Sequence, residues 1–294
     1  TRNSVLSNSK IESRLAVFTM DSFWDPATSS VSLPSNNTIT GTTFTFHRPA
    51  TGLIKYSPWI SVFNIVDLSY PEGLYFNDNT INVNKKICSN CFLQAMWMHA
   101  GNTATIHNNT ITGVDRGLGI SNSFQWVLSS NTISVVPNNQ NFGFDGIYSS
   151  GGGTVMQNTF VGNGSKSQGI FHDLGWESGT CTDNGGSYYS NKLSGFLIGY
   201  LDAYSAQYWQ SQGLCTPGPA NQTVVLGNNF QNSIYYNVFS PNPTVVTSFW
   251  QNYYDDHVNC NPQPSGVCGN PYLLSGPFWS TPNQDNSPLA QPWP

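Results

Sequence analysis

The sequence predicts an all-β chain that winds into a parallel β-helix, a solenoid in which each coil stacks on the coil before it. The main observation is a short phrase that recurs along the 294 residues: Asn, a small or polar residue, a large apolar residue, then Ser, Thr, Asn or Gly. Its copies begin at Asn37, Asn79, Asn109, Asn131, Asn158, Asn191, Asn228 and Asn252. Internal repeats with a period of about 20–50 residues are the signature of repeat architectures. The shorter intervals fit one coil, and the longer ones fit a coil that carries a loop.

Each part of the phrase has a physical role in such a coil. Asn adopts the left-handed backbone conformation more readily than other residues with a side chain, so we expect it at a corner of each coil. Stacked Asn side chains can also hydrogen-bond from coil to coil as a ladder. The apolar residue two places later is expected to point into the core, because strand side chains alternate between faces. A β-sandwich in which the phrase recurs by chance is the alternative interpretation.

The composition narrows the class of function. Only 9% of residues are charged, against about 25% in an average domain, so the surface must consist largely of uncharged polar side chains. The net charge of -5 and the lack of basic runs argue against nucleic acid as a partner. No apolar stretch reaches the length of a membrane span. The chain begins at Thr1 without a signal peptide, and we expect a processed protein that is secreted or held at a cell surface.

The repeats divide what we expect to be one structural domain into segments. Residues 1–35 lack the phrase and are predicted to form an N-terminal cap or arm, because an exposed solenoid end is a reactive sheet edge. Residues 36–258 are predicted to form the β-helix, with an inserted loop or short helix at about 176–222. Residues 259–294 are rich in Pro, Asn and Gly and are predicted to be an extended tail that caps the other end.

Six cysteines favour disulfide bonds, because an even number is typical of secreted chains that use them. The sequence leaves the pairing open, and proximity favours Cys88–Cys91, Cys181–Cys215 and Cys260–Cys268. Zinc is the rival interpretation, but the Cys88 and Cys91 pair lacks partners at the spacing of a zinc site.

Four Asn-x-Ser/Thr motifs are candidate glycosylation sites. In a secreted chain they would lie on surface loops and could carry glycans. The motifs begin at Asn36, Asn108, Asn163 and Asn221.

The C-terminal third carries a series of motifs that resemble a known group. They read Asn252-Tyr253-Tyr254-Asp255-Asp256, then Asn270-Pro271-Tyr272-Leu273-Leu274, then Asp285-Asn286-Ser287-Pro288-Leu289. Together with the repeats, over about residues 36–290, the chain resembles right-handed parallel β-helix proteins of the pectin-lyase-like superfamily. It is closest in style to NosD-like and carbohydrate-binding surface proteins. The resemblance implies a right-handed parallel β-helix. The group includes lyases, hydrolases, epimerases, phage tailspikes and non-enzymatic surface proteins, so it does not specify an activity.

Enzymes of this superfamily carry acids and bases on one outward face of the helix, and the resemblance implies two candidate sites. The segment Phe142–Ile147 is faintly similar to the Tyr-Gly-Phe-Asp-Pro-His motif of alginate epimerases, with Asp145 at the position of the Asp. Gly146 and Ile147 replace the Pro and the His, so the catalytic histidine is missing. The alternative is that Asp145 caps backbone amides at a corner.

The second candidate site combines His172 and Asp173 with Glu177. A paired acid and base could hydrolyse a glycosidic bond if the carboxyl groups lie at the right separation. The alternative is a loop whose polar side chains cap its own backbone.

Aromatic and acidic runs supply two further candidate sites. Tyr200, Tyr204 and Tyr208 recur at helical spacing beside Trp209, which predicts a loop helix packed on the solenoid or, alternatively, a sugar-stacking platform. The run 255–257, Asp-Asp-His, could bind Ca²⁺ through oxygen atoms, but its spacing is not that of a Ca²⁺ loop. No metal or other cofactor is therefore predicted.

These observations favour an extracellular structural or adhesive role, as a subunit of a cell-surface layer, a filament or a virion appendage. The partners would be copies of the chain, other surface proteins or glycans. One alternative is a secreted polysaccharide lyase, hydrolase or epimerase that uses Asp145, His172, Asp173 and Glu177. The other is a carbohydrate-binding module.

Overall fold

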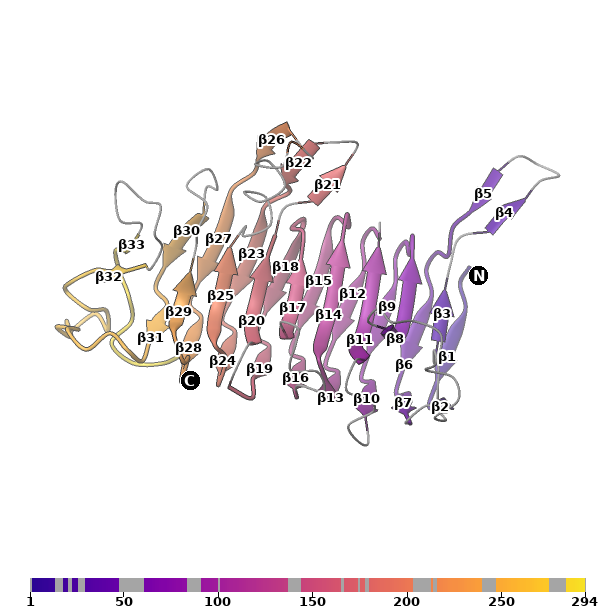
Figure 1. Ribbon diagram of the computed structural model, residues 1–294, viewed down its shortest axis with the longest axis horizontal. Coiled ribbons are helices and arrows are strands. Elements are labelled where there is room, and N and C mark those ends of the chain that lie inside the picture. Colours follow the sequence, from indigo (N-terminus) through magenta and orange to yellow (C-terminus); the bar gives the residue numbers. More distant parts are fainter. Residues whose placement is uncertain are drawn as a thin grey trace.

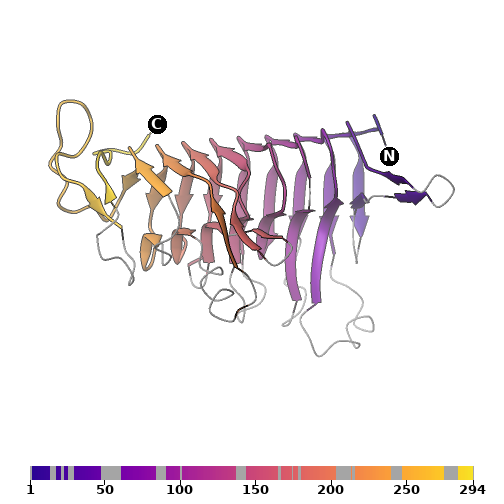
Figure 2. The same cartoon turned by 90° about the horizontal axis from the view of Figure 1, so that it is seen from above.

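The computed structural model is an all-β parallel β-helix, as the repeats predict (Figure 1). Two nine-stranded parallel sheets and one eight-stranded parallel sheet form its sides, and Figure 2 shows the strands of successive coils stacked along the long axis. No helix occurs within the part of the chain that the structure describes. That part comprises residues 2–13, 18–20, 23–25, 30–47, 61–83, 91–99, 101–136, 144–164, 167–173, 175–177, 180–202, 213, 216–239, 247–274 and 284–293.

Each coil visits the three sheets in the same order, which we call sheets 1, 2 and 3. Sheet 1 consists of β1 (Val5–Ser7), β6 (Thr38–Thr40), β9 (Tyr75–Asn77), β12 (Thr105–His107), β15 (Trp126–Ser129), β18 (Gly153–Met156), β23 (Gly186–Tyr189), β27 (Thr223–Leu226) and β30 (Thr247–Trp250). Sheet 2 consists of β2 (Lys10–Ser13), β7 (Thr43–Phe46), β10 (Thr80–Val83), β13 (Thr110–Val114), β16 (Thr132–Val135), β19 (Thr159–Val161), β24 (Lys192–Ser194), β28 (Asn229–Gln231) and β31 (Tyr253–Tyr254). Sheet 3 consists of β3 (Phe18–Met20), β8 (Ser61–Ser69), β11 (Cys91–His99), β14 (Arg116–Ser121), β17 (Phe144–Ser149), β20 (Ser167–His172), β25 (Ile198–Asp202) and β29 (Tyr236–Phe239).

Small sheets project from this body. An antiparallel hairpin joins β4 (Phe23–Asp25) to β5 (Ser30–Ser32). An accessory sheet contains β21 (Gly175–Glu177), β22 (Thr180–Asp183) and β26 (Thr216–Ala220). A last pair joins β32 (Tyr272–Leu273) to β33 (Gln284–Asp285).

The apolar residues of the phrase form the expected core column. Their side chains are buried, and burial of each contributes about 1.5–3 kcal/mol relative to exposure. They pair in register along sheet 2 in the order Ile81, Ile111, Ile133, Phe160, Leu193, Phe230 and Tyr254.

A ladder of buried Asn side chains follows the corner between sheets 1 and 2. At each step the Oδ1 atom of one Asn accepts the backbone N–H of the Asn one coil earlier, at 2.8–3.0 Å. The same oxygen accepts the side-chain amide of that earlier Asn. The corner therefore leaves no buried donor without a partner along this ladder, which consists of Asn79, Asn109, Asn131, Asn158, Asn191, Asn228 and Asn252.

The structure corrects the reason for Asn at this corner. The left-handed conformation belongs to the residue before each ladder Asn, not to the Asn itself. Asn is needed because its amide both donates and accepts hydrogen bonds. The left-handed residues, with φ between 51° and 65°, are Asp78, Asn108, Ser130, Gln157, Ser190, Gly227 and Gln251.

Asn37 is not part of the ladder. It directly precedes β6 in sheet 1, where its Oδ1 accepts the N–H of Ser4 at 3.0 Å. Thr42 takes the ladder position in that coil, and its N–H donates to Asn79 Oδ1 at 2.9 Å. The phrase at Asn37 was assigned to the wrong corner because the corner before sheet 1 and the corner before sheet 2 have the same local pattern. In both, a left-handed residue such as Asn36 or Asp78 shortly precedes a strand.

Two predicted segments turn out to be parts of the solenoid. Within residues 1–35, β1, β2 and β3 form the first coil, and the β4–β5 hairpin lies outside the three main sheets. Within 176–222, β23, β24 and β25 form a full coil, and β22 and β26 belong to the accessory sheet. In the first coil, Ser9 stands where later coils have the ladder Asn, which is why the phrase was not detected there.

The C-terminal segment, 259–294, covers the last coil. Asp285 on β33 occupies the next ladder position, and its Oδ2 accepts the N–H of Asn252 at 3.0 Å. The ring of Tyr272 stacks on that of Tyr254, with centroids 3.7 Å apart. The described part of the predicted tail therefore caps the solenoid, with Asp285 at the end of the ladder and Tyr272 at the end of the core column.

Candidate functional site

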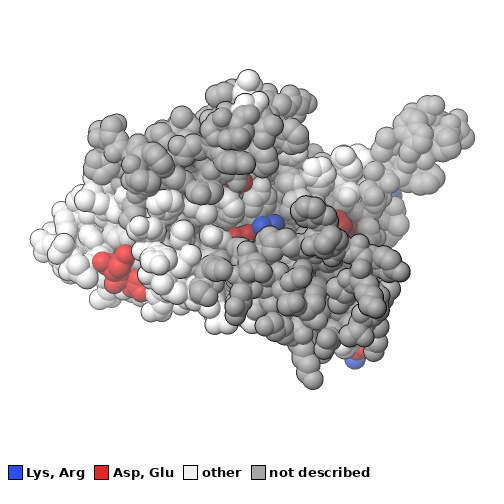
Figure 3. All heavy atoms as spheres, in the orientation of Figure 1, with Lys and Arg blue, Asp and Glu red and all other residues white. Residues whose placement is uncertain are grey.

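Asp145 lies on the outer face of sheet 3 beside the partly exposed cation Arg116. The two residues are in register on β17 and β14, and Nε and Nη2 of Arg116 lie 2.9 and 2.7 Å from Oδ2 of Asp145. Figure 3 shows that charged side chains are sparse among the described residues on this face of the molecule. The side chain of Asp145 is 3% exposed and that of Arg116 is 20% exposed.

The surroundings of Arg116 hold it in place. Its guanidinium lies over the rings of Phe92 and Tyr148, 5.0 and 4.9 Å from their centroids, and Nη1 donates to Gln94 Oε1 at 3.1 Å. Burial raises the pKa of Asp145, and the charge of Arg116 opposes that rise. The carboxylate of Asp145 is therefore paired with the guanidinium of Arg116, as in an ion pair that stabilises a fold.

His172 belongs to the core. It is fully buried at the end of β20, with Nδ1 2.8 Å from the Tyr188 hydroxyl and Nε2 3.3 Å from the Thr223 hydroxyl. Both ring nitrogens are therefore engaged by protein groups. The sequence could not show this, because Tyr188 and Thr223 come from other coils.

Asp173 is 2% exposed, and its Oδ2 accepts the hydroxyl of Tyr148 at 3.3 Å. Burial, and then the charge of Asp173, raise the pKa of Tyr148. The structure thus links Asp145 and Asp173 indirectly, through Arg116 and Tyr148. Glu177 lies on β21 in the accessory sheet, and its side chain is outside the described residues.

The predicted ring platform is wrong at Tyr200. This residue lies on strand β25, not on a helix, and its fully buried ring meets those of Tyr188 and Phe249 edge-on, at 5.5 and 5.8 Å. An interval of four residues fits a strand face as well as a helix face, so spacing alone could not distinguish them. Tyr204, Tyr208 and Trp209 lie outside the described residues.

The Asp-Asp-His run is engaged in closing the C-terminal end. Asn237 Nδ2 donates to both Asp255 Oδ1 and Asp256 Oδ1, at 3.1 and 2.6 Å, and the Tyr272 hydroxyl donates to Asp256 Oδ2. Within the described ranges, no three His, Cys, Asp or Glu side chains are grouped in a way that could hold a metal ion.

The modification sites have mixed outcomes. Asn36, Asn108, Asn163 and Asn221 are all exposed, and the amide nitrogen of Asn108 donates to Asp78 Oδ1 at 2.6 Å. The Cys260–Cys268 disulfide is present. The side chains of Cys88, Cys91, Cys181 and Cys215 lie outside the described residues.

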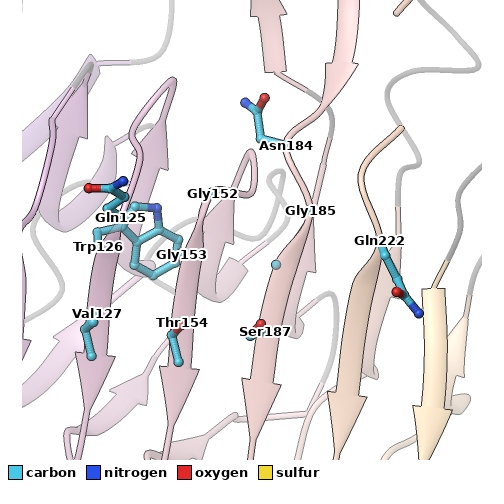
Figure 4. Close-up of a pocket in the computed structure, with 11 residues that line it drawn as sticks. Gln125, Trp126, Val127, Gly152, Gly153, Thr154, Asn184, Gly185, Ser187 and Gln222 are labelled. Atoms are coloured by element: carbon cyan, nitrogen blue, oxygen red, sulfur yellow. The ribbon is translucent and has the colours of Figure 1, made fainter. Parts of the chain in front are cut away.

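The structure also has a groove that the sequence did not indicate, at the corner between sheets 3 and 1. We call it the amide groove, and its walls include Gln125, Trp126, Gly153, Thr154, Asn184 and Gln222. Its cavity measures about 390 Å³, and Figure 4 shows Gln125 and Gln222 on opposite sides with Asn184 at one end.

A second cavity of about 770 Å³ continues the amide groove toward the N-terminal coils. It shares Gln125 and Asn184 with the first cavity and adds Asn102, Asn122 and Phe124. The ring of Phe124 is 43% exposed. The signal that could have revealed this groove is the pair of glycine runs at 151–153 and 185–186, which leaves this corner without side chains in two successive coils.

The chain matches no protein-family model, and comparisons with curated proteins and with solved structures likewise find no match. Among the described residues there is no helix long and apolar enough to cross a membrane.

Proposed function

We propose that the chain is a non-catalytic, extracellular structural or adhesive β-helix, related to the pectin-lyase-like and NosD-like surface proteins. The observation that carries the proposal is the state of the candidate catalytic groups. Asp145 is paired with Arg116, His172 is enclosed by two hydroxyls, and Asp173 accepts a hydrogen bond from a buried Tyr. Each of these groups stabilises the wall of the solenoid, which supports a scaffold rather than an acid–base site.

An exposed aromatic cluster supports an adhesive or self-assembling role. Ile234, Tyr235 and Tyr236 are 54%, 70% and 39% exposed, next to β29. The ring of Tyr236 stacks on that of Phe239 at 5.1 Å. Contiguous exposed apolar patches mark contact surfaces, and a chain with 9% charged residues offers little electrostatic repulsion between copies. The partner that we propose for this cluster is a second copy of the chain.

Extracellular placement is supported by the disulfide and by the nearly uncharged surface. A disulfide persists in oxidising compartments and is rare in the reducing cytosol. The closing motifs also assemble as a unit, because Asp285 contacts both Asn252 and Tyr254. This arrangement favours the relationship to the surface β-helix group.

Sedimentation velocity over a range of protein concentrations, followed by negative-stain microscopy, tests the assembly proposal. We expect oligomers or filaments from the natural chain, and monomers from Tyr235→Asp. The matched control is Tyr70→Asp, which replaces a Tyr that is 42% exposed elsewhere on the solenoid, and it should assemble normally. A monomer at every concentration, or equal loss in both variants, would contradict self-assembly through this cluster.

A cleavage screen tests the non-catalytic part of the proposal. Neutral and acidic polysaccharides are incubated with the chain, and reducing ends and unsaturated products are measured. We expect no product above the level of a heat-inactivated sample. Product that disappears in Asp173→Asn, with the variant still folded by circular dichroism, would refute the proposal.

A further inference from the structure

The geometry points to the amide groove as a binding site for a neutral, extended polysaccharide. This inference concerns a corner of the solenoid away from the ring cluster at 234–236, and it does not rest on self-assembly. It follows from the chemistry of the lining, from the direction of the groove and from one hydrogen-bond donor that has no partner.

Among the described residues, the lining of the amide groove is polar and carries no charge. Those residues wall its two cavities with amide side chains, hydroxyl groups, exposed backbone and rings, and none of them is Asp, Glu, Lys, Arg or His. A primary amide donates and accepts hydrogen bonds, and so does a sugar hydroxyl. A phosphate, sulfate or carboxylate would find no counter-charge here. The lining therefore matches a ligand whose recognised groups are hydroxyls.

The groove runs along the solenoid and not across it. Gln125, Gly152, Gly185 and Gln222 directly precede β15, β18, β23 and β27, four neighbouring strands of sheet 1. Neighbouring strands lie about 4.8 Å apart, which is close to the length of one pyranose ring in a linear chain. Equivalent wall positions thus repeat at about the spacing of sugar units. This geometry fits a polymer better than a compact metabolite.

Asn184 supplies the observation that points to a ligand. Its Nδ2 is buried and has no hydrogen-bond partner, in contrast to two other side-chain donors of the lining. Gln222 Nε2 donates to the Ser248 hydroxyl at 2.9 Å, and Trp126 Nε1 donates to the Gly151 carbonyl at 3.1 Å. Buried donors in native proteins are almost always paired, so an unpaired one calls for an explanation. A rotation of this amide on binding would let a ligand hydroxyl accept its hydrogen bond.

The glycine floor allows a ligand to approach the backbone. Gly153 has a structural reason of its own, because a Cβ there would overlap the indole of Trp126. A Cβ on Gly185 would lie 2.8 Å from the Gln222 carbonyl oxygen. These requirements explain why the residues are glycines, and the consequence is that their backbone itself lines the groove. The exposed ring of Phe124 at the N-terminal end of the groove offers a surface on which a sugar face can stack.

Affinity electrophoresis in gels that contain one soluble polymer tests the inference. The neutral probes are hydroxyethyl cellulose, xylan, galactomannan and laminarin, and the acidic probes are polygalacturonate and dextran sulfate. The test variant is Thr154→Tyr, which fills the groove with a ring. The matched control is Thr38→Tyr, because Thr38 and Thr154 are both partly exposed on sheet 1 but lie four coils apart. Asn184→Ala removes the unpaired donor.

We expect at least one neutral polymer to retard the natural chain, with an affinity that 0.5 M NaCl leaves unchanged, because no charge takes part. Thr154→Tyr should weaken retardation at least tenfold and Asn184→Ala severalfold, while Thr38→Tyr leaves it unaltered. Binding only to acidic polymers, equal loss in both tyrosine variants, or no retardation by any of the four neutral polymers would overturn the inference. Far-ultraviolet circular dichroism of each variant confirms that a loss of binding is not a loss of fold.

Discussion

Replacement of one ladder residue, Asn158→Ala, tests the main physical argument about the fold. Asn158 is fully buried in the middle of the solenoid. Its Oδ1 accepts both the backbone N–H and the side-chain amide of Asn131, each at 2.9 Å. Its Nδ2 donates to the carbonyl oxygens of Leu128 and Met156 and to Asn191 Oδ1, at 2.9–3.0 Å. Alanine removes all five of these hydrogen bonds at once.

The expected loss follows from the groups that are left behind. The backbone N–H of Asn131 keeps no acceptor, and each unpaired buried polar group costs about 1–3 kcal/mol. The Asn131 side-chain amide retains the Ile106 and Ser129 carbonyls, so its share of the cost is smaller. We therefore expect Asn158→Ala to lower the free energy of unfolding by about 3 kcal/mol, with the backbone donor as the largest part.

Urea unfolding followed by tryptophan fluorescence measures this loss. The matched control is Asn163→Ala, produced in a host that does not glycosylate, because Asn163 is exposed five residues further along the chain. The control should stay within about 0.5 kcal/mol of the natural chain. A loss below about 1 kcal/mol for Asn158→Ala would mean that water replaces the amide, and the ladder would then not be the main restraint at this corner.

Three further outcomes are expected. Arg116→Met should lower the unfolding free energy by about 3–5 kcal/mol at pH 7, because it leaves the carboxylate of Asp145 buried without its cation. Burial already raises the pKa of Asp145, and loss of the cation raises it further. The loss of unfolding free energy in Arg116→Met should therefore shrink as the pH is lowered toward 4 and the carboxyl binds a proton. An equal loss at pH 7 and pH 4 in urea titrations would contradict this reasoning. Cys260→Ser opens a disulfide with a sequence separation of 8 and should cost about 2.5 kcal/mol, seen as a lower Tm than that of the non-reduced natural chain. Peptide mapping without reduction should find Cys181 joined to Cys215, because Cys181 pairs with Pro217, two residues after Cys215, between strands β22 and β26. A different pairing would contradict this prediction.

The sequence predicted the fold class because one corner of every coil imposes the same chemical demand. That corner needs a side chain that both accepts and donates, so Asn recurs there and the core residue follows at a fixed offset. The other two corners make no such demand and tolerate insertions of different length. The coil within 176–222 was therefore assigned to an insertion although it carries the ladder residue Asn191, whereas the first coil was missed because Ser9 stands at its ladder position.

The candidate site was less predictable, because its contacts join residues of different coils. Asp145 and Arg116 are 29 residues apart in sequence, and they meet only because β14 and β17 are neighbours. His172 is enclosed by Thr223, 51 residues away. A local motif shows that a carboxylate or an imidazole is present but not what stands on the next coil. The sequence did not indicate the amide groove for the same reason, because its walls come from successive coils that meet only in the folded chain.

The ladder also explains why the chain ends its solenoid with an acid. The ladder has a direction, because each Asn donates its backbone N–H and its side-chain amide to the Oδ1 of the next coil. The last member, Asn252, therefore needs a partner that only accepts, and Asp285 provides one through Oδ2. Its other oxygen accepts the N–H of Ser287, so an Asn at 285 would have to turn an NH₂ group toward one of these donors. The Asp at the last ladder position accepts hydrogen bonds but donates none, so it ends the ladder, whereas an Asn there would present an amide donor to a further coil.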